Sequence, residues 1–97
     1  MEITKNLVDG TLTVAISGRI NTNTAPQFEQ ELSDLSGVTH LVLDFADVSY
    51  ISSAGLRVIL KTRKVMARQG DMVVRNVKPE IYEVFEMTGF LDFLTIE

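Results

Sequence analysis

The sequence predicts an α/β fold, in which a mixed β-sheet of four to five strands is flanked by helices in the order β-β-α-β-α-β-α-(β). Two observations predict it. Short apolar or alternating stretches recur along the chain, and stretches with apolar residues at helical spacing separate the later ones. Strands joined through helices are typical of parallel neighbours with right-handed crossovers. The 97 residues, 45% hydrophobic and 23% charged, correspond to one folded domain, 1–97.

A β-hairpin is predicted at the start of the chain. Ile3–Leu7 is a short strand candidate, and Asp9-Gly10 is a turn signal. Residues 12–16 then alternate between apolar and polar or small side chains, which is the period of a half-buried strand. Gly18 is expected to end this second strand.

The first helix is predicted to begin after Thr24. Thr24 and Gln27 have the spacing of a capping box, and Pro26 suits the first helical turn. Gly37 is expected to end the helix. The predicted apolar stripe consists of Ala25, Phe28, Leu32 and Leu35.

The remaining elements alternate between strands and helices. The apolar run Leu41–Phe45 predicts a strand covered on both faces, followed by a helix over Ser53–Gln69 that stops at Gly70. Asp71–Asn76 predicts another buried strand. Pro79 opens a third helix that ends at Gly89, and residues 91–96 are a candidate last strand or an irregular end.

The net charge of −4 conceals a strong segregation of charge. Residues 57–78 contain seven basic residues and one acid, whereas the rest of the chain contains two basic residues and twelve acids. Within the predicted second helix, the spacing aligns four of the basic side chains in one stripe. This stripe is either a solvated helix face or a surface that attracts an acidic partner. Nucleic-acid binding is disfavoured, because the chain as a whole is acidic and the stripe contains no aromatic residues. The stripe consists of Arg57, Lys61, Lys64 and Arg68.

Two adjacent serines mark the junction between the central strand and the second helix. Either Ser52 or Ser53 can act as a simple N-cap by accepting a backbone N–H. The same N–H groups, together with the helix dipole, would also stabilise a phosphate there, with Arg57 one turn away. Gly55 is expected to let another backbone approach closely, and Leu56 to be a partly exposed apolar contact.

The residue types for catalysis and metal binding are mostly absent. Cysteine is missing and His40 is the single histidine. The strand from His40 to Asp47 spans about 23 Å at about 3.3 Å per residue, which separates His40 from Ser53. Asp44 and Asp47 are a minor metal candidate, and Asp47 is more simply a turn or cap residue. We therefore expect no enzyme, catalytic residue, metal or cofactor.

The stretch Asp47–Leu60 resembles the signature of the STAS domain, the anti-sigma factor antagonist module that also occurs on sulphate transporters. Gly18-Arg19-Ile20-Asn21 resembles the family's Gly-x-Leu-Asp loop, and Met87-Thr88-Gly89-Phe90 resembles its Thr-Gly-Leu motif near the C-terminus. These segments cover nearly the whole chain in the family's order and spacing. The resemblance therefore implies a STAS fold.

The family's phosphorylatable serine falls on Ser53, two residues before Gly55. Three neighbouring positions depart from the family pattern. Ser52 stands where the family has aspartate, Ala54 where it has serine or threonine, and Asn21 where it has the loop aspartate. Ser52 is consequently an alternative phosphate acceptor.

The resemblance implies a switch in which the unphosphorylated domain binds an anti-sigma factor that is also its serine kinase, which frees a sigma factor for transcription. Phosphorylation prevents that binding, and a phosphatase would restore it. The alternative is a STAS scaffold module that is never phosphorylated and binds a transporter or a membrane-associated complex. Since no long apolar run exists, we expect a cytoplasmic protein without membrane insertion. The implied partner-binding residues are Asn21, Thr22, Asn23, Ser52, Ser53, Ala54, Gly55, Leu56, Arg57 and Lys61.

Overall fold

A computed structural model describes residues 1–97 and contains a five-stranded mixed sheet with three α-helices. The element order β-β-α-β-α-β-α-β confirms the predicted fold class. The strands are β1 (Glu2–Val8), β2 (Thr11–Ile20), β3 (His40–Ile51), β4 (Asp71–Arg75) and β5 (Thr95–Ile96). The helices are α1 (Ala25–Glu31), α2 (Ser53–Met66), α3 (Pro79–Met87) and a short 3₁₀ turn, η1 (Phe90–Asp92).

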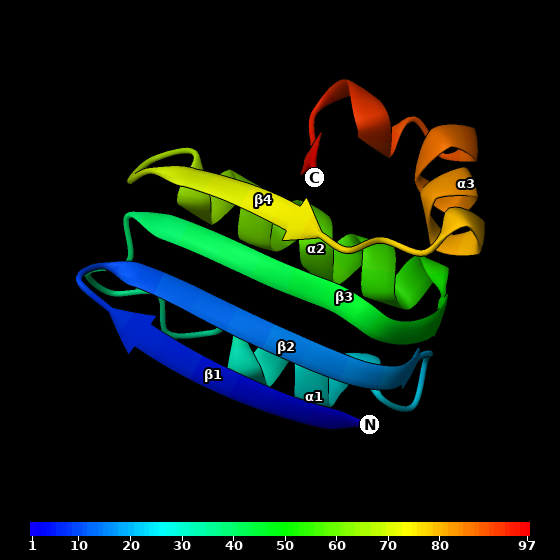
Figure 1. Ribbon diagram of the computed structural model, residues 1–97, viewed down its shortest axis with the longest axis horizontal. Coiled ribbons are helices and arrows are strands. Elements are labelled where there is room, and N and C mark those ends of the chain that lie inside the picture. The colour runs from blue at the N-terminus through cyan, green and yellow to red at the C-terminus, as the bar shows by residue number, and fades with distance from the viewer.

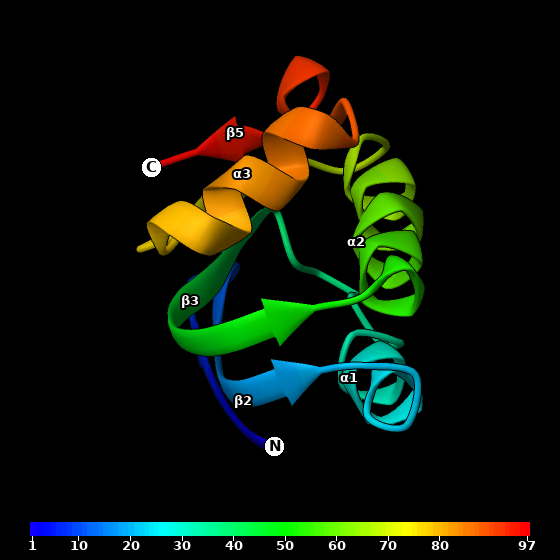
Figure 2. The ribbon, with the colours of Figure 1, turned by 90° about the vertical axis from the view of Figure 1, so that its right-hand side faces the viewer.

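The strands lie side by side in sequence order, as Figure 1 shows. β1 pairs antiparallel with β2, and every later neighbour is parallel. The α1 and α2 helices lie together on one face of the sheet, whereas α3 packs beyond the bent end of β3 (Figures 1 and 2). The loops that follow β2 and β3 are therefore at the same end of the molecule.

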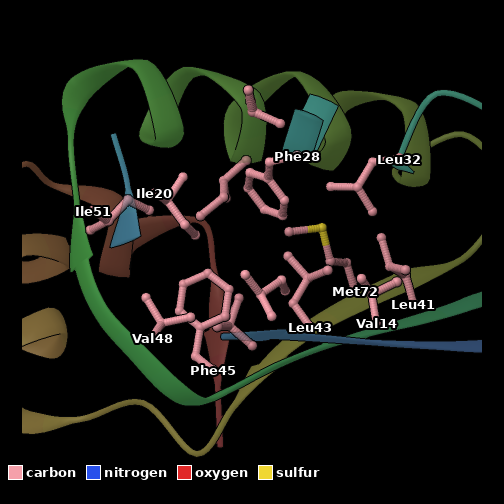
Figure 3. Close-up of a cluster of buried hydrophobic side chains, with 14 of the residues drawn as sticks. Val14, Ile20, Phe28, Leu32, Leu41, Leu43, Phe45, Val48, Ile51 and Met72 are labelled. Atoms are coloured by element: carbon pink, nitrogen blue, oxygen red, sulfur yellow. The ribbon is translucent and has the colours of Figure 1, made fainter. Parts of the chain in front are cut away.

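The hydrophobic core lies between the sheet and the α1–α2 layer (Figure 3). Phe28 from α1 and Ile59 from α2 are fully buried, and each such side chain stabilises the fold by roughly 1.5–3 kcal/mol. Val42 points to the sheet face without these helices, yet only 2% of it is exposed. Its neighbours in the strand register are Thr13 and Val73.

β2 continues past the predicted stop at Gly18. Gly18 has a φ of 100°, and the pairing with β3 shifts register between Gly18 and Arg19. A glycine in this conformation accommodates a bulge without ending the strand. The strand therefore reaches Ile20, and the expectation that Gly18 ends it is wrong.

The capping box and the length predicted for the first helix are wrong. Thr24 is the N-cap residue but makes no side-chain cap; its Oγ1 instead accepts from Asn21 N at 2.8 Å and donates to Arg19 O at 2.7 Å. The helix ends at Glu31, six residues before Gly37. The predicted apolar stripe is nevertheless buried, since the chain after Glu31 keeps packing on the core. Its members are Ala25, Phe28, Leu32 and Leu35.

β3 is more than twice as long as predicted. It extends from the apolar run through Asp47, which is a strand residue and not a turn or cap, to Ile51. The exposed pair Ala46 and Asp47 interrupts the apolar pattern, because an irregular register with β2 lies there. The strand consequently leads directly to the second helix.

The later boundaries agree closely with the sequence. α2 begins at Ser53 as predicted but ends at Met66, and turns carry the chain to Gly70. α3 begins at Pro79 as predicted, and Gly89 follows it with a φ of 80°.

A contrast between two glycines tests this packing. A Cβ on Gly70 would lie 1.8 Å from the backbone oxygen of Thr39, whereas a Cβ on Gly37, at a φ of 76°, would meet nothing within 4 Å. We expect Gly70→Ala to lower the free energy of unfolding by about 2 kcal/mol or more, because the backbone at Thr39 or at position 70 must shift to make room for the methyl group. Gly37→Ala should cost only about 1 kcal/mol, from conformational strain. Urea denaturation of both variants measures the difference, and equal losses would contradict the packing described.

Candidate partner-docking site

The predicted site lies where the carboxyl ends of β2 and β3 meet the first turn of α2. Ser52 N donates to Ile20 O at 2.8 Å, so the backbone of the serine pair is bonded to the end of β2. The loop after β2 leads to α1, which packs beside α2 (Figure 2). The structure thus brings the loop residues 21–23 and the serine pair to one end of the molecule.

The two serines have different environments. Ser52 is the N-cap of α2, half-buried, and its Oγ accepts from Gly55 N at 3.4 Å. Ser53 is the first residue of the helix; its side chain is exposed and its hydroxyl makes no hydrogen bond. The interpretation of a serine N-cap is therefore confirmed for Ser52. The Ser53 hydroxyl is left free at the positive end of the helix dipole.

The loop after β2 is held by its own side chains. The Asn21 Oδ1 accepts from Asn23 N at 2.9 Å and from Thr24 N at 3.0 Å, which is an Asx turn. Asn21 is half-buried, whereas Thr22 and Asn23 are exposed. Asn21 therefore fixes the loop, and the following two residues form its surface.

Gly55 and Leu56 lie beneath this surface. A Cβ on Gly55 would lie 2.6 Å from Ile20 Cγ2 and 2.9 Å from Ile51 Cγ1, so the glycine fits core side chains of its own chain. The expectation that it lets another backbone approach is wrong. Leu56 is 6% exposed, so the expectation of a partly exposed contact is wrong as well.

A shallow groove runs between α1 and α2 beside the serine pair. Lys61 Nζ crosses it to Glu29 Oε2 at 2.6 Å, while Arg57 is exposed and forms no ion pair. An exposed pair such as Lys61–Glu29 contributes only about 0–1 kcal/mol. Arg68 lies beyond the end of α2, away from Ser53. The groove is lined near the serines by Thr22, Ala25, Pro26, Glu29, Ala54, Arg57, Val58 and Lys61.

Sequence reasoning did not include the pair formed by Arg19 and Tyr50. The two residues face each other in the β2–β3 register, and the Arg19 guanidinium carbon lies 4.3 Å from the centre of the Tyr50 ring. Tyr50 is 39% exposed, a boundary position. Nothing in the local pattern indicates this contact, because it depends on a register across two bulges.

The structure does not bring together a catalytic set. His40 lies at the opposite end of β3 from Ser53, and its Nδ1 contacts the Asp71 carboxylate. No three His, Asp or Glu side chains are grouped as metal ligands would be. The Ser36 N–H and hydroxyl lower the pKa of the Asp34 carboxyl, also away from the site. No helix has the length and apolar character needed to cross a membrane.

The family model of the STAS domain matches residues 2–97. The chain belongs to the STAS family. BtrV of Bordetella bronchiseptica, which bears the name of a putative anti-sigma factor antagonist, is 39% identical over 99% of this chain and 85% of its own length. The chain is thus homologous to anti-sigma factor antagonists.

Solved structures share the fold of this STAS domain. An anti-sigma factor antagonist from Mycobacterium paratuberculosis superposes with a TM-score of 0.87 at 24% identity, over 98% of this chain and 83% of that one. The Bacillus antagonist SpoIIAA in its unphosphorylated form gives 0.78 at 18% identity, over 99% and 87%. SpoIIAA in its phosphorylated form gives 0.76. At these identities the likeness shows the fold alone.

The contrast between the two serines is testable by stability. Ser52→Ala removes the cap of α2 and should lower the free energy of unfolding by about 1 kcal/mol. Ser53→Ala removes an exposed hydroxyl without a partner and should change it by less than about 0.5 kcal/mol. Urea denaturation of the two variants and the parent measures the order, and a larger loss for Ser53→Ala would contradict the assignment.

Proposed function

We propose that this STAS domain is an anti-sigma factor antagonist controlled by phosphorylation of Ser53. In its unphosphorylated form it binds an anti-sigma factor that is also a serine kinase, and so frees a sigma factor. A phosphatase restores the binding form. The observation that carries the proposal is the exposed, unbonded Ser53 hydroxyl at the start of α2, in a chain homologous to antagonists.

The acceptor choice follows from hydrogen bonding. Phosphorylating Ser52 would alter the side chain that accepts the Gly55 N–H and would disturb the helix cap. Phosphorylating Ser53 leaves that cap in place. The free N–H groups of the first turn and the neighbouring Arg57 favour a phosphate there. The modification would therefore change the surface and not the fold.

The switch works through the cost of burying charge. A phosphate adds about −1.5 to −2 charge at pH 7, and a docked partner would have to exclude water from it. A hydroxyl can be buried at small cost, whereas a dianion without a matching donor cannot. The exposed residues of the loop after β2 and of α2 that would meet the partner are Thr22, Asn23, Arg57 and Lys61.

The switch acts in the cytoplasm. Residues 1–97 work as one STAS domain in the cytoplasm, where sigma factors and anti-sigma factor kinases act. The alternative, a scaffold module that is never phosphorylated, shares the same fold, so only the chemistry at Ser53 separates the two.

Incubation with the cognate kinase and ATP tests the proposal. The kinase is found by co-purification with the full chain, then expressed and purified, and the modified residue is mapped by mass spectrometry. We expect one phosphate on Ser53, absent in Ser53→Ala and retained in Ser52→Ala. We also expect the phosphorylated chain to lose its affinity for the kinase. A stable complex that never transfers phosphate would instead support the scaffold module.

Charge on α2 should set the rate of association. Reversing Arg57 and Lys61 together to Glu should slow binding of the purified kinase by about tenfold or more at low salt, because it opposes electrostatic steering. The difference should shrink as salt rises. Stopped-flow association rates at several salt concentrations measure this. Arg68→Glu, beyond the end of α2, is the control, and unchanged rates in the double variant would reject the role.

A further inference from the structure

Arg19 and Tyr50 form an exposed pair on the face of the sheet that carries neither α1 nor α2. Successive strand residues point to opposite faces. Ile20 and Ile51 point toward Gly55 of α2, so the preceding residues, Arg19 and Tyr50, point the other way. The pair lies near the carboxyl ends of β2 and β3, the same end as the serine pair, but on the opposite face of the sheet from α2.

The backbone on both sides of the Arg19 side chain is held in place. Thr24 Oγ1 donates to Arg19 O at 2.7 Å, and Ser49 Oγ donates to Gly18 O at 3.3 Å. The bulge at Gly18, with its φ of 100°, sets the register that brings Arg19 opposite Tyr50. Bulges of this kind redirect side chains next to functional sites. The backbone of Arg19 is thus held in place before any partner arrives.

Arg19 carries a charge that no carboxylate neutralises. The other basic side chain outside residues 57–78, Lys5, is paired with Glu31, but Arg19 has no acidic partner within ion-pair distance. Its contact is the Tyr50 ring, which orients the guanidinium and leaves its charge in place. Arginine and tyrosine are enriched among the residues that dominate interface energies. A side chain already ordered loses less entropy on binding.

We propose that Arg19 and Tyr50 form a second anchor for the anti-sigma factor, which receives a carboxylate from an acidic segment of that partner. The proposal rests on the proposed function. A single carboxylate suits the pair better than a polyanion, because Glu2 and Asp47 line a shallow groove on the same face and would repel a continuous negative chain. The docking surface therefore extends around the loop after β2 to both faces of the sheet.

A double-mutant cycle on the full chain tests the anchor, with the purified anti-sigma factor kinase as the probe. Arg19→Gln and Tyr50→Leu should each raise the Kd about tenfold. Together they should raise it far less than the roughly hundredfold expected for independent losses, because the ring acts by orienting the guanidinium. The matched controls are Arg68→Gln and Tyr82→Leu, an exposed arginine and a 42% exposed tyrosine elsewhere, and each should leave the Kd within about twofold.

The outcomes separate the anchor from the switch. The thermal unfolding of each variant is measured first, to check that it keeps the parent's stability. If Arg19→Gln does not, Arg19→Lys takes its place, because its flexible ammonium should also weaken binding. If the wild-type chain binds the kinase and the Arg19 and Tyr50 variants bind it with the same Kd, the anchor is overturned and the Ser53 switch is left intact. Independent, multiplicative losses would overturn the pairing of the two side chains. Failure of the wild-type chain to bind any kinase would remove the proposed function itself.

Discussion

The close packing of Gly55 against Ile20 and Ile51 is the constraint on which the site depends. The last residues of β2 and β3 occupy the space that a side chain at position 55 would need. Only glycine lets the first turn of α2 settle onto both strand ends, which fixes the Ser52 cap and the direction of Ser53. The same two isoleucines set the opposite direction of Arg19 and Tyr50. One buried contact thereby orients groups on both faces of the sheet.

In this arrangement, the residues that hold the site in shape are different from the residues whose side chains a partner can contact. Gly55 and Leu56 are buried and Asn21 is occupied with its own loop, so substitutions there would act through the fold. Thr22 and Ser53 are exposed and make few internal contacts. A charge added to Ser53 can therefore change binding without melting the helix, since the N-terminal N–H groups accommodate it. A switch of this type needs a rigid base more than a mobile element.

The sequence predicted the features that depend on local chemistry. Ser53 and Pro79 open their helices because a cap and a proline act within one turn. The length of β3 was not predictable, because exposed Ala46 and Asp47 break the apolar run where the register with β2 is irregular. The Thr24 capping box failed because the Thr24 hydroxyl oxygen accepts from the Asn21 N–H and not from an N–H of the helix. Features that depend on the register between strands can be identified only from the three-dimensional structure.

The charges around the site also explain how one phosphate could weaken binding without abolishing all attraction. A phosphate on Ser53 lies one turn from Arg57, so it would neutralise the nearest cation and add an uncompensated negative charge. Lys61 is already engaged with Glu29 across the groove. Arg19, on the other face of the sheet and held over Tyr50, lies outside this local change. An acidic partner would then still be steered toward the end of the sheet but would fail to close over the helix. Because the phosphate both neutralises Arg57 and prevents closure over the helix, phosphorylation should slow formation of the complex and also shorten its lifetime.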